Sequence, residues 1–270
     1  MITLKQYILD AFSNRQFGGN SAAVIVLEHW LPDDFMLKIA QQNNLSETAF
    51  LVRQTEDWHI RWFSPIKEID FCGHASLASA EVLLHFYQEQ NHYTDSLKFY
   101  CRAKGQFSIQ RLSTHRYQLN FPNEKPELVT DIPEDLLAGL SLKPIEVYRN
   151  GQAYFVVYDS SEQVKQLEID VVKIKKLDPL DVVATAKGQV SDFVCRYFWP
   201  AGGGYEDPVT GSIHAGLFPF WAERLQKDHL ISHQVSTRLG ILEGQLLDDR
   251  VLISGDVVLF SESQLFLING

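Results

Sequence analysis

The sequence has few of the features that mark secreted, membrane-spanning or metal-binding proteins. It contains only three cysteines, Cys72, Cys101 and Cys195, an odd number at spacings unlike those of a metal site. We therefore expect reduced thiols, no metal and a cytoplasmic location. No apolar run approaches the roughly 20 residues of a membrane span, and residues 1–12 lack the basic start and apolar stretch of a signal peptide.

Positive charge is also scarce. The chain carries 24 Lys and Arg against 34 Asp and Glu, a formal net charge of −10. This balance argues against nucleic acid and anionic membrane surfaces as partners. An anionic substrate would need local hydrogen-bond donors, such as the start of a helix. With 45% hydrophobic and 21% charged residues, the 270-residue chain has the composition of a globular protein with room for two lobes.

Several catalytic motifs are missing as well. The chain has no dinucleotide-binding fingerprint, phosphate-binding loop or paired metal-ligand motif. The segment Gly211-Ser212-Ile213 lacks the nucleophile elbow that a serine hydrolase requires. Hydride transfer, nucleotide chemistry and serine hydrolysis are therefore disfavoured.

The most informative stretch that is present spans residues 204–217. It begins with acids and a proline, passes through Thr-Gly-Ser, and continues with apolar residues at helical spacing. Pro208 keeps Asp207 extended, and Thr210, Gly211 and Ser212 are residue types that open helices. The pattern predicts a helix start where free N–H groups and polar side chains share a small volume, which suits an anion.

The same plan occurs earlier, at residues 68–77. Gly73 and Gly211 stand 138 residues apart, and at that offset His74 falls on Ser212. Internal repetition of this kind suggests two similar lobes, each with one helix start, and a ligand between them.

Periodicity supports this division into two halves. The first half is typical of strands and two helices, which we predict at residues 2–12, 22–27, 33–42 (helix), 45–52, 58–63, 74–88 (helix), 97–102, 105–112 and 116–121. Residues 122–126 contain two prolines and are the best candidate linker. The second half is expected to contain strands and one long helix, at 145–149, 154–158, 161–177 (helical patches), 182–187, 193–199, 211–225 (helix), 233–246, 250–260 and 264–268. We therefore predict lobes at 1–121 and 127–260, with the last strand, about 260–270, a candidate to return to the first.

Four residues could carry chemistry. Glu47 is flanked by small hydroxyl residues and precedes an apolar strand, so it could lie at a cleft mouth and exchange protons with a substrate. His74, Asp207 and Ser212 lie at the two predicted helix starts. Each also has an ordinary explanation: a solvent-facing glutamate, a helix-packing histidine, a turn aspartate and a helix-opening serine. His214 faces away from Ser212 on the helix, so we expect it to pack.

Four segments of the chain match one family. They are Gly19-Asn20-Ser21-Ala22-Ala23-Val24, Leu45-Ser46-Glu47-Thr48-Ala49-Phe50, the two parts of the first repeat from Arg61 to Pro65 and from Cys72 to Ala75, and Glu206-Asp207-Pro208-Val209-Thr210-Gly211-Ser212. On these motifs the chain resembles the phenazine-biosynthesis F-type (PhzF-like) isomerases, which are related in fold to diaminopimelate epimerase.

The resemblance implies an α/β (α+β) fold of two similar lobes, each a mixed sheet rolled around a central helix, with the active site in the cleft between them. It also implies cofactor-free isomerisation by proton transfer on a small carboxylated substrate, and a homodimer. By motif match, Glu47 is the general acid/base, and the other catalytic residues are His74, Asp207 and Ser212. The substrate-binding residues implied in the same way are Asn20, Gly73, Thr210 and Gly211.

The sequence departs from the family pattern in three places. Ser21 stands where proline is usual, Ile213 replaces a small residue, and Leu239 stands where a second glycine is common. Because Ile213 could narrow the pocket, the phenazine substrate is not carried over. The epimerases of this fold use one cysteine at each helix start, whereas here Cys72 fills one position and Thr210 the other.

Our hypothesis is therefore an isomerase that moves a proton on a small carboxylated substrate, which could be cyclic. Two alternatives stay open at this stage. One is a catalytically idle protein that binds an organic acid on the same fold. The other is a one-base epimerase or racemase.

Overall fold

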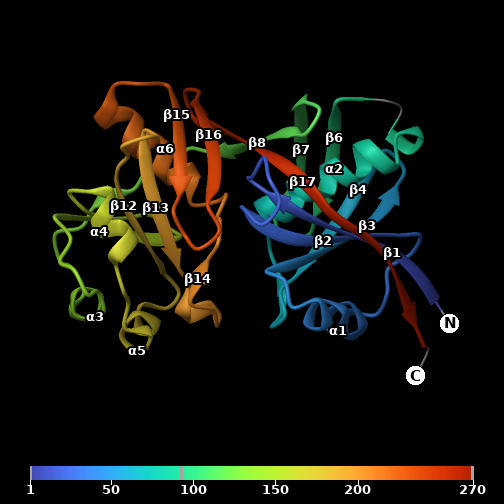
Figure 1. The fold of residues 1–270 in the computed structure, drawn as a ribbon, viewed down its shortest axis with the longest axis horizontal. Coiled ribbons are helices and arrows are strands. Elements are labelled where there is room, and N and C mark those ends of the chain that lie inside the picture. Colours follow the sequence, from blue (N-terminus) through green and yellow to red (C-terminus); the bar gives the residue numbers. More distant parts are fainter. Residues whose placement is uncertain (1, 92–93, 269–270) are drawn as a thin grey trace. The chain divides into compact units, whose positions relative to one another are not determined.

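The computed structural model describes residues 2–91 and 94–268, and more of these residues lie in strands than in helices (Figure 1). The chain divides into two compact units, which are described separately below. The first contains Met1–Asn120 and Ser254–Gly270, and the second contains Phe121–Ile253. Within the described residues, no helix is both long enough and apolar enough to cross a membrane.

In the first unit the strands form a closed ring. β17 pairs with β1, β1 with β2, β2 with β3, β3 with β4, β4 with β6, β6 with β7, β7 with β8, and β8 again with β17. The strands are β1 (Ile2–Ala11), β2 (Asn20–Leu27), β3 (Glu47–Gln54), β4 (Asp57–Phe63), β6 (Ser96–Cys101), β7 (Gly105–Ser113), β8 (Arg116–Pro122) and β17 (Arg250–Leu267). A short strand, β5 (Glu68–Ile69), pairs with the end of β4. The sheet thus closes into a barrel.

Helix α2 (Gly73–Phe86) is the central helix of this barrel. Every residue from Gly73 to Leu84 is buried, so the helix has no solvent-facing side. Its sequence suits this position, because small residues let β1, β2 and β3 approach closely while Leu77, Leu83 and Leu84 fill the interior. A helix that has no solvent-facing polar side is stable only when it is enclosed. We predicted this helix at about 74–88, close to its observed bounds.

The outer face of the same sheet is covered by α1 (Asp33–Asn43). Phe50 and Val52 of β3 pack into a core with Met36 and Ile39 of this helix. Side chains alternate along a strand, so Glu47, Ala49 and Leu51 lie on the opposite face, toward α2. A two-sided sheet of this kind explains why β3 is buried almost continuously.

The second unit repeats this plan with different lengths. Its strands pair in the order β9, β10, β11, β12, β13, β15, β16, with β14 beside the end of β13. They are β9 (Glu127–Leu128), β10 (Glu146–Arg149), β11 (Ala153–Val157), β12 (Asp181–Lys187), β13 (Phe193–Phe198), β14 (Glu206–Asp207), β15 (His229–Gln234) and β16 (Gly240–Leu246).

Helices cover both faces of this second sheet. On one face, α3 (Glu134–Ala138), α4 (Ser161–Gln166) and α5 (Val171–Ile174) surround a core that includes Val156, Ala184 and Phe198. On the other face lies α6 (His214–Leu225), whose Trp221 stacks on Phe193 and donates a hydrogen bond to Thr185. Short 3₁₀ turns complete the structure, at Glu89–Asn91, Lys175–Leu177 and Pro200–Gly202.

Strand registers show that the repeat extends beyond the helix starts. β2 runs parallel to β3 with Ala22 opposite Glu47, and β11 runs parallel to β12 with Ala153 opposite Asp181. In the next pairs, Thr48 lies opposite Phe63, and Val182 lies opposite Phe198. The short strands then place Glu68 opposite Phe63 and Glu206 opposite Phe198. Asp181 therefore occupies in the second unit the position that Glu47 occupies in the first.

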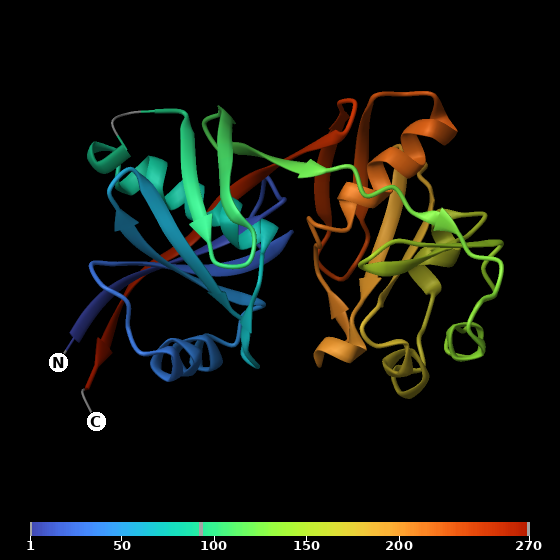
Figure 2. The same ribbon diagram turned by 180° about the vertical axis from the view of Figure 1, so that it is seen from behind.

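Three expectations about individual elements were wrong. The second repeat helix begins at His214, because residues 211–213 form a tighter turn whose hydrogen bonds run from His214, Ala215 and Gly216 to carbonyls three residues back. The two strands expected at 250–260 and 264–268 are one strand, β17, which ends at Leu267. The polar run Ser261-Glu262-Ser263 looked like a break, but it pairs with β1 as an exposed part of the ladder (Figure 2). The strand expected at 233–246 is interrupted, because β15 ends at Gln234 and β16 begins at Gly240.

Candidate functional site

Glu47 is the first residue of β3, at the edge of the barrel where α2 begins. Its side chain is 14% exposed and lies on the face of the sheet that meets α2. Its Oε2 atom lies 3.0 Å from Nε2 of His74, the second residue of that helix. The structure thus brings together two predicted catalytic residues that are 27 positions apart in the sequence.

The hydrogen bonds around His74 indicate which ring nitrogen carries the proton. The side-chain nitrogen of Asn20 lies 3.3 Å from Nδ1 of His74, and an amide nitrogen can only donate. Nδ1 is then the acceptor, so in the neutral ring the proton is on Nε2 and faces Glu47. Oε2 of Glu47 is buried, and among the described residues nothing donates a well-aligned hydrogen bond to it. A carboxylate oxygen in this state is available to take a proton.

Cys72 precedes α2 and completes the group. Its Sγ lies 3.4 Å from Nδ1 and 3.8 Å from Nε2 of His74. Ligand atoms of Glu47, Cys72 and His74 all lie within 4.8 Å of one another, and carboxylate, thiolate and imidazole are ligands of zinc. Within the part of the chain that the structure describes, these three residues form the group that could hold a metal. The start of α2, at Gly73, has no side-chain cap and no acidic residue in its first turn.

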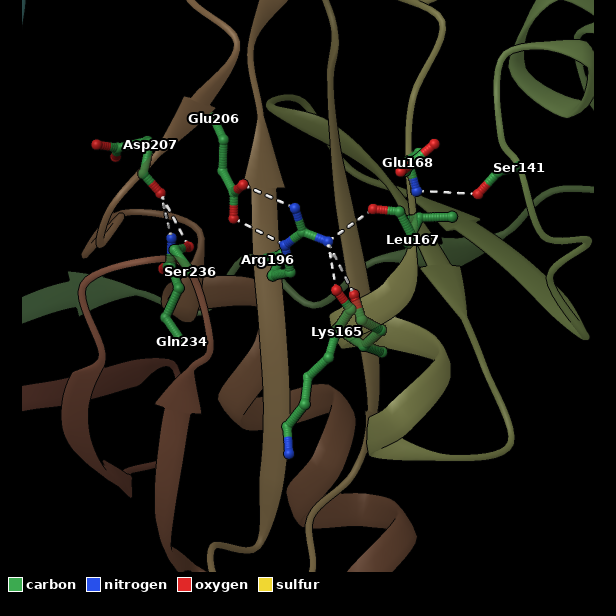
Figure 3. Close-up of polar contacts among 10 residues, drawn as sticks. Ser141, Lys165, Leu167, Glu168, Arg196, Glu206, Asp207, Gln234 and Ser236 are labelled. Carbon is green, nitrogen blue, oxygen red and sulfur yellow. Dashed lines mark hydrogen bonds and ion pairs between the residues drawn. The ribbon is translucent and has the colours of Figure 1, made fainter.

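Asp207 and Thr210 lie together ahead of the second helix. The Thr210 hydroxyl donates to the Asp207 carboxylate. Gln234 of β15 holds the backbone on both sides: its Nε2 donates to the Asp207 carbonyl at 2.7 Å, and its Oε1 accepts from the Thr210 N–H at 2.9 Å. Ser236 also donates to the Asp207 carbonyl, and Figure 3 shows both contacts. This clamp fixes the bend that follows β14.

Ser212 lies in the turn before α6, next to Gly211. Its Oγ accepts a hydrogen bond of 2.9 Å from the Gln152 side chain. The same nitrogen of Gln152 donates to the Tyr197 hydroxyl at 3.0 Å, and that hydroxyl donates to Asp181 at 2.6 Å. Burial raises the pKa of Asp181 to about 6, and the hydrogen bond from Tyr197 partly opposes this rise. Neither Gln152, the partner of Ser212, nor Tyr197 and Asp181 behind it were predicted.

A signal for Asp181 does exist in the sequence. Asp181 precedes the apolar run V-V-A-T-A in the same way that Glu47 precedes T-A-F-L-V. Gln152 and Tyr197 carry no comparable signal, because isolated polar residues at strand ends are ordinary.

His214 packs inside the second unit, as we expected. It is completely buried, and burial lowers its pKa to about 4. Its Nδ1 donates to the Thr210 carbonyl at 2.8 Å, so Nε2 is the acceptor of the Ser232 hydroxyl, also at 2.8 Å. The ring is therefore neutral and serves as structural support for the turn that carries Ser212.

An arginine supports each helix start from the neighbouring strand. Arg61 makes two parallel hydrogen bonds to Glu68, at 2.7 and 2.6 Å, and Arg196 makes two to Glu206, both at 2.8 Å. Arg196 also donates to the carbonyls of Val164, Lys165 and Leu167 at the end of α4 (Figure 3). Glu68 and Glu206 lie on the short strands β5 and β14, so each pair fixes the segment that leads into the helix start.

Comparison with known proteins agrees with this architecture. Residues 9–263 match the family model described as phenazine biosynthesis-like protein (PhzC-PhzF). A protein of Pseudomonas aeruginosa named an uncharacterized isomerase is 42% identical over 264 residues, covering 98% of this chain and 99% of the relative. A PhzF-family crystal structure from Enterococcus faecalis matches with a TM-score of 0.92 at 40% identity, covering 98% of this chain and 100% of the other.

A more distant structure shares the fold alone. A hydroxyproline epimerase from Agrobacterium vitis matches with a TM-score of 0.61 at 10% identity, covering 97% of this chain and 92% of the other. The predicted relation in fold to the epimerases is therefore confirmed. The family model that matches residues 9–263, with the 42% identical relative, shows that the chain belongs to the phenazine biosynthesis-like (PhzC-PhzF) protein family.

Proposed function

We propose that the protein is an isomerase that moves a proton on a small carboxylated substrate by general acid/base catalysis, without a cofactor. The observation that carries this proposal is the buried contact of 3.0 Å between Glu47 Oε2 and His74 Nε2 beside the start of α2. The isomerase names of the curated relatives support the reaction class.

Glu47 is the proton-transfer group in this proposal. As a carboxylate it takes a proton from the substrate through Oε2, and as the acid it returns the proton to another position. The N–H dipole at Nε2 of His74, 3.0 Å away, stabilises the carboxylate without a well-aligned hydrogen bond, and Asn20 fixes the ring in that tautomer. The uncapped N–H groups at Gly73 favour a substrate carboxylate, because a helix start carries partial positive charge.

Residues of the second unit serve the same reaction in this proposal. Asp207 and Ser212 position the substrate and assist proton transfer, and the backbone around Thr210 and Gly211 contributes donors. The Gln234 clamp supports these assignments, since it fixes the backbone of this segment.

A screen for solvent-hydrogen exchange tests the proposal. Purified protein is incubated in D₂O with a panel of small cyclic and linear carboxylic acids, and deuterium incorporation is followed by mass spectrometry. In Glu47→Gln, exchange should fall by roughly 10²- to 10⁴-fold, because glutamine keeps the shape but cannot carry the proton. Glu56→Gln is the matched control, since Glu56 is an exposed glutamate in the turn that follows β3.

Two outcomes would reject the proposal. Undiminished exchange in Glu47→Gln removes Glu47 from the reaction. Thermal stabilisation of the wild type by an acid, with no exchange for any acid, favours an organic-acid-binding protein. Running the screen before and after chelator treatment tests the absence of a metal at Glu47, Cys72 and His74, because a catalytic metal would make the exchange chelator-sensitive.

A one-base epimerase is the second candidate, favoured by the contact of 3.4 Å between Cys72 Sγ and His74 Nδ1. A thiol beside an imidazole at a helix start can act as a base. Cys72→Ser separates the two candidates. It should abolish exchange if the thiol carries the proton, and leave most exchange intact if Glu47 does.

A further inference from the structure

Four polar side chains of the second unit form a continuous chain of hydrogen bonds. Asp181 Oδ2 accepts from the Tyr197 hydroxyl, and the Tyr197 oxygen and Ser212 Oγ each accept from Nε2 of Gln152. Tyr197 is 4% exposed, so its hydroxyl is held inside the unit. Asp181 lies on β12 and Tyr197 on β13, Gln152 directly precedes β11, and Ser212 lies in the turn before α6.

The chain dictates which way the Ser212 hydroxyl points its proton. The Gln152 amide nitrogen has two hydrogens and no acceptor capacity, so both of its partners must accept. Tyr197 can accept because its own proton goes to the Asp181 carboxylate. The Ser212 oxygen therefore accepts the hydrogen bond from Gln152, and the Ser212 hydroxyl proton remains available for donation to another group. This chain of hydrogen bonds makes Ser212 a hydrogen-bond donor.

The position of Asp181 in the fold supports a role beyond packing. It is the counterpart of Glu47 by strand register, as the pairings of β12 with β11 and β13 show. Both carboxylates open a strand that is parallel to the preceding one. Both lie on the sheet face that meets the buried helix, since Val182 and Ala184 of the alternate face pack with α3, α4 and α5.

We propose that Asp181, acting through Tyr197 and Gln152, is a positioning residue that holds Ser212 as the hydrogen-bond donor to the substrate. This inference rests on the isomerase function proposed above. Asp181 itself transfers no proton to the substrate in this scheme. Its carboxylate fixes the direction of every hydrogen bond in the chain.

Protonation of Asp181 would disturb the chain. Burial raises the pKa of Asp181 to about 6, the Tyr197 hydrogen bond lowers it, and the nearby charge of Asp178 raises it. Burial and the charges of Asp181 and Asp207 raise the pKa of Tyr197, so the phenol stays protonated. Once Asp181 carries a proton, its carboxyl group can donate to the Tyr197 oxygen. The Tyr197 hydroxyl is then no longer held as the acceptor of the Gln152 amide. Exchange should therefore decline as the pH falls through about 6.

The test combines three variants with one control. In Tyr197→Phe the link between Asp181 and Gln152 is lost, and the exchange rate should fall about tenfold, the typical effect of one polar contact. In Ser212→Ala, adding Tyr197→Phe should cause no further loss, because both act through the same hydroxyl. Asp181→Asn keeps an acceptor oxygen, so it should retain most of the rate at pH 8 and lose the decline near pH 6.

Tyr158→Phe is the matched control. Tyr158 is also a buried tyrosine of the second unit, but its hydroxyl donates to the Leu142 carbonyl away from this chain. Its loss should leave the exchange rate unchanged. A rate loss for Tyr197→Phe that adds fully to that of Ser212→Ala, or that Tyr158→Phe reproduces, would overturn the inference.

A readout without substrate separates this inference from the proposed isomerase function. In the free wild-type protein, the side-chain amide signals of Gln152 in ¹⁵N NMR should shift with a midpoint near pH 6. The shift should be absent in Asp181→Asn. If the Gln152 side-chain amide shift does not change with pH near 6, the inference is overturned even if the enzyme is active. A coupled titration in a protein that exchanges no acid leaves the network standing and rejects the proposed isomerase.

Discussion

The two helix starts share a scaffold and differ in the groups they present. In each unit a bidentate arginine–glutamate pair supports the short strand. In each unit, too, a side chain donates to the backbone carbonyl four residues before it: Ser76 to Cys72, and His214 to Thr210. In the first unit the strand-opening carboxylate faces an imidazole. In the second it faces a phenol that leads to a serine. The shared contacts hold the backbone, so the presented side chains were free to diverge.

The supporting ion pairs differ in burial, which gives the largest effect expected from this comparison. Arg196 and Glu206 have side chains 12% and 13% exposed, whereas those of Arg61 and Glu68 are 23% and 42% exposed. Arg196→Met should lower the free energy of unfolding by about 3 kcal/mol, because it leaves a largely buried carboxylate and three helix-end carbonyls without their donor. Urea unfolding followed by tryptophan fluorescence measures it.

Arg61→Met is the matched variant for the first unit. An exposed pair contributes little, so the expected loss is about 1 kcal/mol or less. Equal losses in the two variants would mean that burial does not distinguish the two supports.

The residues that bind the turn carbonyl also differ, and this difference predicts an acid effect. Ser76 donates to Cys72 in the first unit, and His214 donates to Thr210 in the second. The pKa of His214 is lowered to about 4, below the unfolded value of 6.5, so stability is present above pH 6.5 and is lost as the pH falls toward 4. Linkage makes this loss about 2 kcal/mol at pH 5.

His214→Gln cannot titrate, so its urea midpoint should change less between pH 7 and pH 5 than that of the wild type. His229→Gln is the control, because the His229 side chain is 60% exposed. The same pH slope in His214→Gln and the wild type would contradict a neutral, buried His214.

The smallest expected effect comes from substitutions at one equivalent position of the two helices. Gly216 in α6 stands 138 residues after Ala78 in α2. A Cβ at Gly216 would lie 2.8 Å from Cζ of Phe155 and 2.9 Å from the Glu124 carbonyl oxygen. Gly216→Ala should therefore destabilise by about 1 kcal/mol, crowding of 1–3 kcal/mol less the helix preference of alanine.

Ala78→Gly should cost a similar amount for the opposite reason, a lost buried methyl group and a more flexible backbone. Thermal unfolding of both variants measures these losses. An unchanged or raised melting temperature for Gly216→Ala would show that α6 can shift to make room, and the two helices would then be equivalent at this position.

Much of the fold followed from the sequence because its signals are local. The apolar runs of β2, β3 and β12 and the helical spacing of α2 predict those elements, and the offset between Gly73 and Gly211 predicts the repeat. The start of α6 was misplaced, because Gly211 and Ser212 suit a 3₁₀ turn as well as a helix. The break expected near Ser261–Ser263 was wrong, because pairing with β1 overrides the polar composition.

The site was predictable only in part, for a related reason. The contact of Glu47 with His74 joins two motifs, and both motifs were recognised. The residues that lead from Ser212 to Asp181 lie just before β11, on β13 and on β12, and strand register brings them together, which a single sequence does not encode locally. At the position of Tyr197, register places Trp62 in the first unit, opposite Ala49 as Tyr197 is opposite Val183. The indole of Trp62 cannot accept a hydrogen bond, so the first unit has no counterpart of the chain of hydrogen bonds from Asp181 to Ser212 at this position.

The ring of strands in the first unit has a consequence for how the chain folds during synthesis. The ring is completed by β17, which begins at Arg250 and pairs with β1 and β8, yet all the other strands of the ring lie before residue 123. During synthesis on the ribosome the barrel cannot close until β17 has emerged, and until then β1 and β8 are unpaired edges. A nascent chain stalled before that point should expose α2 to proteases and chaperones, and release of the last segment should protect it in one step.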